Sequence, residues 1–363
     1  METLRSEYPA ATTSLTTALE LYQAVGNEIG QANALYGLSI LQDRNGDYDA
    51  STASLTQALE LYHGRSNKLG EANVFNSLGN IKYMKSEYPA ATGSLTRALE
   101  LYRVLGRQQG QAHALNNLGN VQYLTSDYPA ATASYSTSLD LYRALGDRHG
   151  EEDVLTNLGN VQCLTGEYVA ATTSLTLALD LCRTLGERWG EGVALTSLGV
   201  VQYHTGEYTA AVTGLTQALE IFRDLGERYG EGHAIAGLGV VQYMMGEYTV
   251  ATASQTQALE MFQTLGNRLG QAECLNNMAE ILLASLQGDQ AQTYGEQALT
   301  IAREVASPLE EARALESIAE CQIRKEQRGE ATLLFQHALE IYRQLGSPYA
   351  KRVEAGMSKY GIR

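Results

Sequence analysis

The sequence predicts an all-α solenoid in which pairs of antiparallel helices repeat every 40 residues. Residues 115–146 read LNNLGNVQYLTSDYPAATASYSTSLDLYRALG, and residues 155–186 read LTNLGNVQCLTGEYVAATTSLTLALDLCRTLG. A fixed period of roughly 20–50 residues is typical of solenoids, which grow by adding neighbouring units. The 363 residues therefore need not form several domains. The period is kept by Leu19, Leu59, Leu99, Leu139, Leu179, Leu219, Leu259, Leu299 and Leu339, and by Tyr8, Tyr48, Tyr88, Tyr128, Tyr168, Tyr208 and Tyr248.

Each unit is predicted to hold two helices separated by turns that contain glycine. In the unit that follows Gly146, apolar residues recur at spacings of three and four, first over residues 154–164 and again over residues 170–182. This period is that of an amphipathic helix. Gly166 and Gly186 follow the two stretches, and glycine commonly ends a helix at such a position.

In the register of the repeat, the chain opens with a lone second helix (residues 1–26). Eight helix pairs follow (27–346), and a lone first helix closes the chain (347–363). The last helix is rich in charged side chains, as the capping element of a solenoid is. The first helix is as apolar as an internal copy. We therefore expect one solenoid of about eighteen helices over residues 1–363, whose N-terminal edge is covered by an upstream segment or a second molecule.

Prolines and N-cap residues predict several helix starts. Asp147 is a candidate N-cap. The sequence SPLE at residues 307–310 matches a capping box with proline at the first helical position, and Ser347-Pro348 repeats this arrangement. Proline also fits the first turn of a helix at Pro9, Pro89 and Pro129.

Glycine recurs in the middle of the first helix, where it costs about 1 kcal/mol relative to alanine. We therefore expect the two helices of a pair to approach closely there, with small residues equivalent to Ala171 facing the glycines. The tyrosines equivalent to Tyr128 are expected to fill the gap between successive pairs. The glycines are Gly79, Gly119, Gly159, Gly199 and Gly239.

The repeat resembles the tetratricopeptide repeat. The resemblance rests on a large residue, Leu-Gly, an aromatic residue, alanine and a further aromatic residue, in the order Leu115, Leu118-Gly119, Tyr123, Tyr128, Ala131, Tyr135 and Leu139. Six residues inserted after Leu141 lengthen the unit from the usual 34 residues. The 40-residue variety is similar to repeats of the Pins/LGN adaptors, of kinesin light chains and of bacterial STAND-type regulators. The resemblance implies a right-handed superhelix whose first helices line a concave groove for a peptide or a protein.

The composition limits the classes of partner. Asp and Glu number 41 against 26 Lys and Arg, which gives a net charge of −15. Because a phosphate backbone or an anionic membrane requires a basic surface, neither nucleic acid nor membrane is expected as a partner. No apolar run is as long as a membrane span, and no signal peptide is recognisable. The dispersed cysteines fit buried thiols in a reducing cytoplasm, where we expect the protein. They are Cys163, Cys182, Cys274 and Cys321.

The chain carries no motif of an enzyme or a cofactor site. It has no phosphate-binding loop of the GxxxxGK[ST] type, no HExxH and no GxSxG. Its six histidines are dispersed, and the acidic run Glu151-Glu152-Asp153 is better explained as a solvated helix start than as a metal site. We expect no catalysis and no cofactor.

The resemblance implies that residues around Leu-Gly of each first helix line the groove. Their character changes along the chain from polar and aromatic through amide-rich and apolar to acidic. The first pair offers Asn33, Tyr36, Ile40 and Arg44. The second to fourth offer Asn76, Asn80, Tyr83, Asn116, Asn117, Asn120, Tyr123, Asn157 and Asn160. The fifth and sixth offer Val200, Tyr203, His204, His233, Val240, Tyr243 and Met244, and the last two offer Glu273, Glu280, Glu316 and Glu320.

Two interpretations of the asparagines at Asn80, Asn120 and Asn160 remain open. An exposed amide has two donors and an acceptor, so a row of them can bind the backbone of an extended peptide. Alternatively, the amides bond to a neighbouring helix and stabilise the stack. The acidic end would favour a ligand segment that bears Lys or Arg.

These observations favour a scaffold that binds a peptide or a partner protein in its groove, as part of a larger regulator. A second hypothesis is a structural module that stacks end to end through its N-terminal edge. A third is an enzyme or cofactor binder with a site built across distant repeats.

Overall fold

The computed structural model describes residues 2–362, and side chains from residue 9 onward. The described residues form eighteen helices and no strand, which confirms the predicted fold class and helix number. Tyr8, the first tyrosine of the repeat register, lies outside the described side chains.

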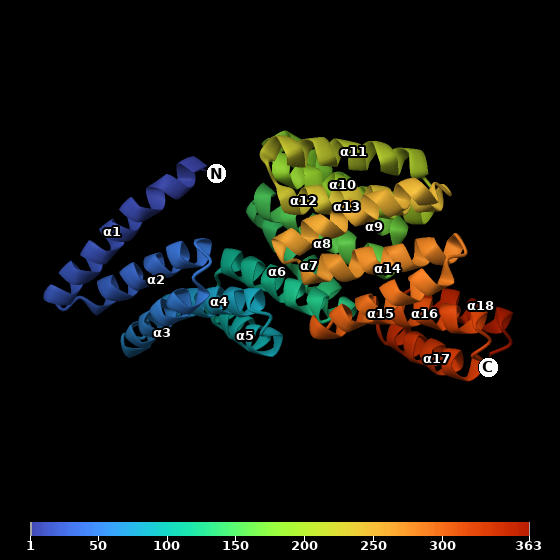
Figure 1. Ribbon diagram of the computed structural model, residues 1–363. Helices are drawn as coiled ribbons and strands as arrows, with labels where there is room; N and C mark the ends of the chain where they lie inside the picture. The colour runs from blue at the N-terminus through green and yellow to red at the C-terminus, as the bar shows by residue number, and fades with distance from the viewer. Residues whose placement is uncertain (1, 363) are drawn as a thin grey trace. The chain divides into compact units, whose positions relative to one another are not determined.

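The chain divides into two compact units. Unit 1 comprises Met1–Gln122 and Ala133–Asp147. It contains the first helices of the chain, coloured blue to green in Figure 1, and all of α6 and α7 except residues 123–132. These helices are α1 (Glu2–Ala24), α2 (Glu28–Arg44), α3 (Tyr48–Gly64), α4 (Lys68–Met84), α5 (Tyr88–Val104), α6 (Gln108–Leu124) and α7 (Tyr128–Leu145).

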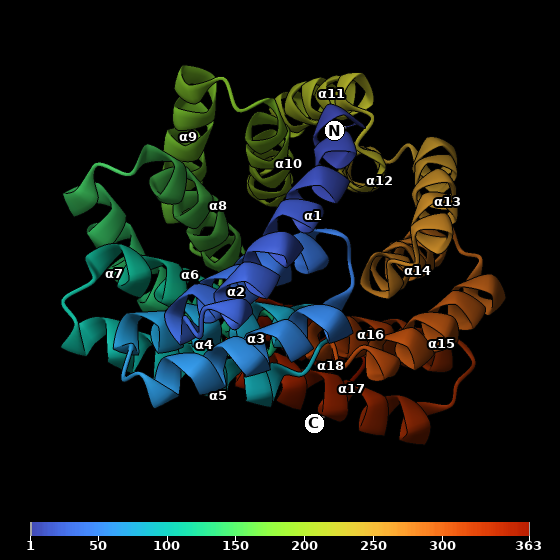
Figure 2. The same cartoon turned by 90° about the vertical axis from the view of Figure 1, so that its left-hand side faces the viewer.

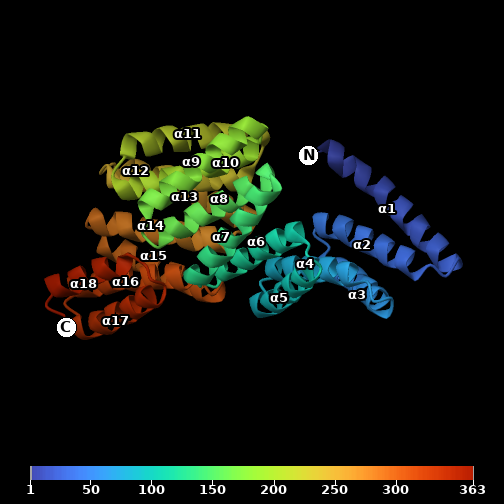
Figure 3. The ribbon, with the colours of Figure 1, turned by 180° about the vertical axis from the view of Figure 1, so that it is seen from behind.

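Unit 2 comprises Tyr123–Thr132 and Arg148–Arg363. Its helix pairs follow one another around a curve (Figure 2), and α16, α17 and α18 lie together at its C-terminal end (Figure 3). Its helices are α8 (Arg148–Leu164), α9 (Tyr168–Leu185), α10 (Arg188–Thr205), α11 (Tyr208–Leu225), α12 (Arg228–Met244), α13 (Tyr248–Leu265), α14 (Arg268–Ala284), α15 (Gly288–Glu304), α16 (Pro308–Arg324), α17 (Arg328–Gln344) and α18 (Tyr349–Lys359).

The helices of a pair approach most closely at the mid-helix glycines. A Cβ atom added at Gly159 would lie 2.5 Å from Leu175, and one added at Gly199 would lie 2.7 Å from Leu215. Real Cβ atoms do not approach so closely, so the glycines are required by packing. The residue nearest the glycine is Leu175, one turn further along α9 than the predicted Ala171, and at Gly79 the carbonyl oxygen of the equivalent Ala91 also lies 3.4 Å from the added Cβ atom.

A serine on the second helix of four of the eight pairs donates a hydrogen bond to a glutamine on the first. The distances are 2.8 Å for Ser54–Gln42, 2.7 Å for Ser134–Gln122, 2.9 Å for Ser174–Gln162 and 2.8 Å for Ser254–Gln242. Gly214 replaces the serine in the α10–α11 pair, and Leu334 replaces it in the α16–α17 pair. In both pairs the buried glutamine oxygen, of Gln202 or of Gln322, has no hydrogen-bond partner. The serine therefore decides whether this buried acceptor is satisfied.

Successive pairs are joined by glutamates held between two basic side chains. Glu231 lies 3.0 Å from Arg223 at the end of α11 and 3.4 Å from Arg228 at the start of α12. Forty residues earlier, Glu191 lies between Arg183 and Arg188 at 3.0 and 3.6 Å. The acidic side chain near the start of α12 is also favourably placed in the field of the helix dipole.

One predicted capping box and one predicted helix start need correction, although α16 does begin at Pro308 with Ser307 as its N-cap. The Ser307 side chain makes no capping hydrogen bond, and Glu310 instead accepts hydrogen bonds from Asn276 and Arg313, so the predicted capping box is wrong. In addition, α1 begins at Glu2, which places Pro9 inside the helix and not in its first turn.

Candidate functional site

The three asparagines of the predicted ladder have different environments. The Tyr135 hydroxyl donates a 2.7 Å hydrogen bond to Asn120 Oδ1. This contact exists because Tyr135 stands where the neighbouring repeats have Leu95 and Leu175, which cannot donate. Asn80 is exposed and Asn160 is partly buried, and neither makes a hydrogen bond to another described residue. The stack-holding interpretation therefore describes Asn120, while Asn80 and Asn160 retain free amides.

The remaining predicted residues of unit 1 form a polar surface with internal contacts. Asn117 Nδ2 donates to Asn76 Oδ1 at 3.4 Å, and the rings of Tyr83 and Tyr88 lie 6.5 Å apart between centroids. Asn116 has partners of its own. One turn nearer the helix starts, Tyr62 donates a 2.6 Å hydrogen bond to Asn33, so that predicted residue fastens α2 to α3.

In unit 2, residues 123–132 and the first helices carry the other predicted residues. The rings of Tyr123 and Tyr128 lie 6.1 Å apart between centroids. Val200 and Val240 are partly buried, whereas Met244 is 43% exposed. Asn157 is partly buried and has partners of its own.

A cluster of charged and aromatic side chains brings four helices of unit 2 together. We define the inner face of unit 2 as the surface of α10, α12, α14 and α16 that bears Tyr203, Tyr243, Glu280 and Arg313. Arg313 is the centre of the cluster. Its guanidinium donates to Glu280 at 2.9 Å, to Glu310 at 3.1 Å and to Asn277 at 2.6 Å.

The charges of this cluster alter the pKa values of its members. Burial alone would raise the pKa of Glu280, but Arg313 and Arg352 outweigh it, and the pKa lies below its ordinary value. Burial, with Arg313 and Arg352, lowers the pKa of His204 to about 4. Burial raises the pKa of Tyr203 well above its ordinary value, and Tyr349 of α18 contributes. Side chains of α10, α14, α16 and α18 thus face one common space.

Two of the four glutamates of the predicted acidic end are paired with the chain's own arginines. Arg352 donates to both oxygens of Glu316, at 3.0 and 2.5 Å, and Arg313 neutralises Glu280. Sequence reasoning missed both arginines, although Arg313 shares the repeat position of Asn33. Its position within the repeat could therefore have identified Arg313 as a groove residue.

Two predicted carboxylates, Glu273 and Glu320, have no hydrogen bond or ion pair with another described residue. Burial and the neighbouring Glu310 raise the pKa of Glu273 to about 8, against a weaker effect of Arg313. Burial and Glu316 likewise raise the pKa of Glu320. Close by, Asn276 is fully buried, and its Oδ1 atom has no partner.

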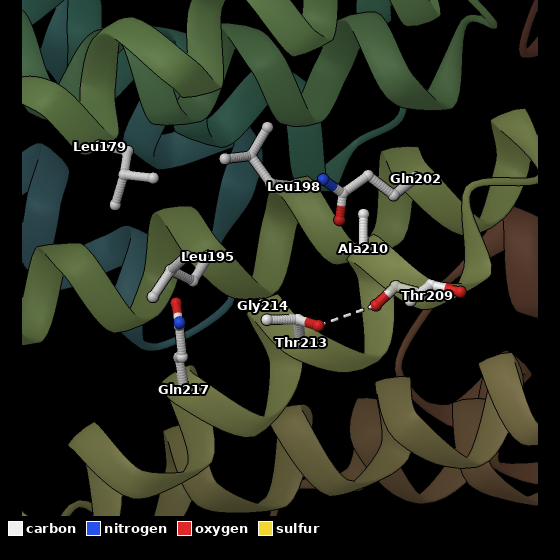
Figure 4. Close-up of a pocket in the computed structure, with 9 residues that line it drawn as sticks. All are labelled: Leu179, Leu195, Leu198, Gln202, Thr209, Ala210, Thr213, Gly214 and Gln217. Carbon is white, nitrogen blue, oxygen red and sulfur yellow. Dashed lines mark hydrogen bonds between the residues drawn. The ribbon is translucent and has the colours of Figure 1, made fainter.

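A hollow is lined by residues of α9, α10 and α11 (Figure 4). Its volume is about 510 Å³, and Gln202, Thr213 and Gly214 are among its lining residues. Leu179, Leu195 and Leu198 line it as well but are only 5–8% exposed. A ligand would remove little apolar surface from water there, so the hydrophobic gain would be small. We do not regard this hollow as a ligand site.

Among the described residues, no group of three or more His, Cys, Asp or Glu side chains is arranged to hold a metal ion. No described helix combines the length and the apolar character needed to cross a membrane.

Comparison with known families decides the assignment. A family model described as tetratricopeptide repeat matches residues 70–144, 110–184, 150–224, 190–264, 233–304 and 270–344. The chain belongs to the tetratricopeptide repeat family. This confirms the resemblance drawn from the sequence. No curated protein matches the chain.

Solved tetratricopeptide repeat structures share its fold. A Rap protein complexed with competence and sporulation factor is 15% identical, with a TM-score of 0.67 over 94% of this chain and 98% of that chain. The Rap conjugation gene regulator of plasmid pLS20, in complex with the Phr* peptide, is 14% identical, with a TM-score of 0.64 over 93% and 96%. A STAND protein from Pyrococcus horikoshii with a tetratricopeptide repeat sensor is 13% identical, with a TM-score of 0.57 over 97% and 55%. At these identities the likeness concerns the fold alone.

Proposed function

We propose that this tetratricopeptide repeat chain is a non-catalytic scaffold that binds a segment of a peptide or a partner protein along the predicted groove residues. The fold supports an interaction role, and of the solved structures with this fold one is complexed with competence and sporulation factor and another with the Phr* peptide. The free amides of Asn80 and Asn160 suit the backbone of an extended segment, since each offers donors and an acceptor.

The ligand segment carries a basic residue. The observation that carries this proposal is the pair of unpaired carboxylates, Glu273 and Glu320, on the inner face of unit 2. Burial disfavours the charged form of both carboxyl groups, and an ammonium or guanidinium group beside them would stabilise that form. The partly exposed Met244 and Tyr243 on the neighbouring α12 would contact apolar side chains of the same segment.

A pull-down from cell lysate with mass spectrometry tests this function. The bait is compared with Asn80→Ala, Asn160→Ala and the double variant Glu273→Gln/Glu320→Gln. Asn120 is left unchanged because its substitution would also break the bond to Tyr135. Glu260→Gln on the outer helix α13 is the matched control, since it removes an exposed carboxylate.

We expect a partner that the natural chain and Glu260→Gln retain and the double glutamine variant loses. A synthetic peptide covering the contact region of that partner should then show the same ranking by calorimetry. Equal retention by all baits of unchanged helicity would refute the proposed groove.

A second candidate function, end-to-end self-assembly, is favoured by one observation. Leu21 and Val25 at the end of α1 are 63% and 74% exposed. Sedimentation velocity over a hundredfold concentration range, with Leu21→Glu/Val25→Glu as comparison, tests it. Association that the double variant abolishes would support self-assembly, and a concentration-independent monomer would exclude it.

A further inference from the structure

We propose that α18 is a built-in competitor for the ligand site on the inner face of unit 2. Arg352 and Tyr349 occupy positions that a basic and an aromatic side chain of a ligand would take, so binding requires their displacement. This inference rests on the proposed function and adds a regulatory step to it.

The first support is the position of the N-terminal end of α18. A Cβ atom added at Gly166, in the turn between α8 and α9, would lie 3.3 Å from Pro348. The ring of Tyr349 lies 6.2 Å from the ring of His204 on α10, between centroids. The last helix of unit 2 therefore reaches the helices that begin the same unit, and it closes the inner face at this point.

The second support is the chemistry of the contact. Arg352 pairs with Glu316, and its guanidinium stacks over the ring of Tyr349 at 4.5 Å. Burial raises the pKa of Glu320, and Arg352 opposes this rise. The guanidinium of α18 thus acts on Glu320, one of the two carboxyl groups that the proposed basic ligand residue would use.

The third support is that the contact is weak enough to be exchanged. The Arg352 side chain is 45% exposed although that of its partner Glu316 is only 11% exposed, so the guanidinium keeps access to water while the pair is formed. Only Val353 and Met357 of α18 are buried in the core cluster shared with α16 and α17. A helix of 11 residues has little stability of its own in water. Displacement of α18 is therefore compatible with an intact α16–α17 pair.

The test uses a fluorescein-labelled peptide with the sequence of residues 347–363 as the probe. It is titrated against the full chain, against Tyr349→Ala/Arg352→Ala and against Lys351→Ala, with anisotropy as readout. The double variant keeps Val353 and Met357, so α18 still caps the core. Lys351 is an exposed cation on the same helix without a hydrogen bond or ion pair to another described residue, which makes it the matched control.

We expect the double variant to bind the probe at least tenfold more tightly than the natural chain and Lys351→Ala. In the natural chain, the attached helix competes at a high effective concentration. A probe that itself carries Arg352→Ala should no longer bind the double variant more tightly than the natural chain. Equal binding of the probe by all three chains, or binding to none, overturns the inference.

A second measurement separates this inference from the proposed function. The partner peptide from the pull-down should bind Tyr349→Ala/Arg352→Ala at least tenfold more tightly than the natural chain. Unchanged or weaker binding would leave the scaffold function intact but show that α18 is only a cap. Failure to find any groove ligand would count against the function and leave the probe experiment to decide on α18.

Discussion

At the scale of single residues, the repeat shows how one hydroxyl satisfies one buried amide. Wherever the second helix has serine and the first has glutamine, the two side chains are bonded at 2.7–2.9 Å. Gln202 and Gln322 lack this partner because Gly214 and Leu334 replace the serine. The hydroxyl-rich second helices, which the sequence alone left unexplained, are thus accounted for in part. Their threonines mostly bond to carbonyl groups one turn earlier, as Thr172 does to Tyr168.

Gly214→Ser should raise the free energy of unfolding by about 1–2 kcal/mol. About half a kilocalorie comes from removing a mid-helix glycine, and the rest from a new hydrogen bond to Gln202. A Cβ atom fits at this site, with its nearest neighbour 3.7 Å away. Urea denaturation measures the change. Gly93→Ser, exposed and without a heavy atom within 4 Å, should gain only the smaller share. Equal gains in both variants would contradict the role of Gln202.

Glu273 should make stability depend on pH between about 4.5 and 8. Its folded pKa, raised to about 8 by burial and Glu310, exceeds the ordinary value of 4.5. The folded state therefore holds the proton more strongly, and its stabilising effect is lost as pH rises through 8. Glu273→Gln cannot ionise, so the melting temperature of this variant should exceed that of the natural chain by a margin that grows up to pH 8. Glu260→Gln serves as control, and a constant margin for Glu273→Gln would disprove the assignment.

At the scale of the helix pair, the close contact between α10 and α11 depends on Gly199. Gly199→Ala should lower the free energy of unfolding by about 1–2 kcal/mol, because overpacking against Leu215 outweighs the better helix propensity. Gly93→Ala, which has open space, should stabilise instead. The cost of Gly199→Ala should shrink by at least about 1 kcal/mol in a Leu215→Ala background, as a double-mutant cycle would show. Additive effects would mean that the two residues do not press on each other.

Helices were predictable from the sequence because their signals recur every 40 residues. The apolar spacing and the turn glycines located the pairs, and the glycine register anticipated the close approach within each pair. The pattern did not show that the side chain nearest Gly159 is that of Leu175, one turn further along α9 than Ala171. The capping box at Ser307 failed because Glu310 finds stronger partners in Asn276 and Arg313, which lie on α14 and one turn along α16.

At the scale of the whole molecule, the net charge of −15 should make ligand capture sensitive to salt. Raising NaCl from about 50 to 500 mM shortens the screening length to a few ångströms. We expect the affinity for a basic ligand to fall at least about tenfold, mainly through a slower association rate, because steering acts on encounter. Stopped-flow measurement with the partner peptide checks this, and Glu273→Gln/Glu320→Gln should flatten the dependence. Salt-independent association would argue for apolar recognition.

The sequence predicted the fold better than the candidate site. Helix periodicity is a local property, whereas the cluster around Arg313 depends on how far unit 2 curves before α18 meets α10. No spacing along the chain shows that Tyr349 lies near His204, which is 145 positions earlier. The sequence showed that the last first helices carry glutamates. It could not show that Arg313 and Arg352 pair with Glu280 and Glu316, because these ion pairs form between different helices. That the predicted groove residues together bind a ligand remains a prediction.

The ion pairs of Glu191 and Glu231 between successive helix pairs imply that whole repeats could be removed or added without changing the interfaces between the remaining pairs. If residues 187–226 were excised, Gly186 would be followed by Glu227, and Arg183 would meet Glu231 in the geometry it now shares with Glu191. Every bond between a serine and its glutamine lies inside one 40-residue cassette, so none would be cut. Lengthening or shortening the array by whole cassettes would then alter its reach and its ligand preference, while each interface kept the chemistry it already has.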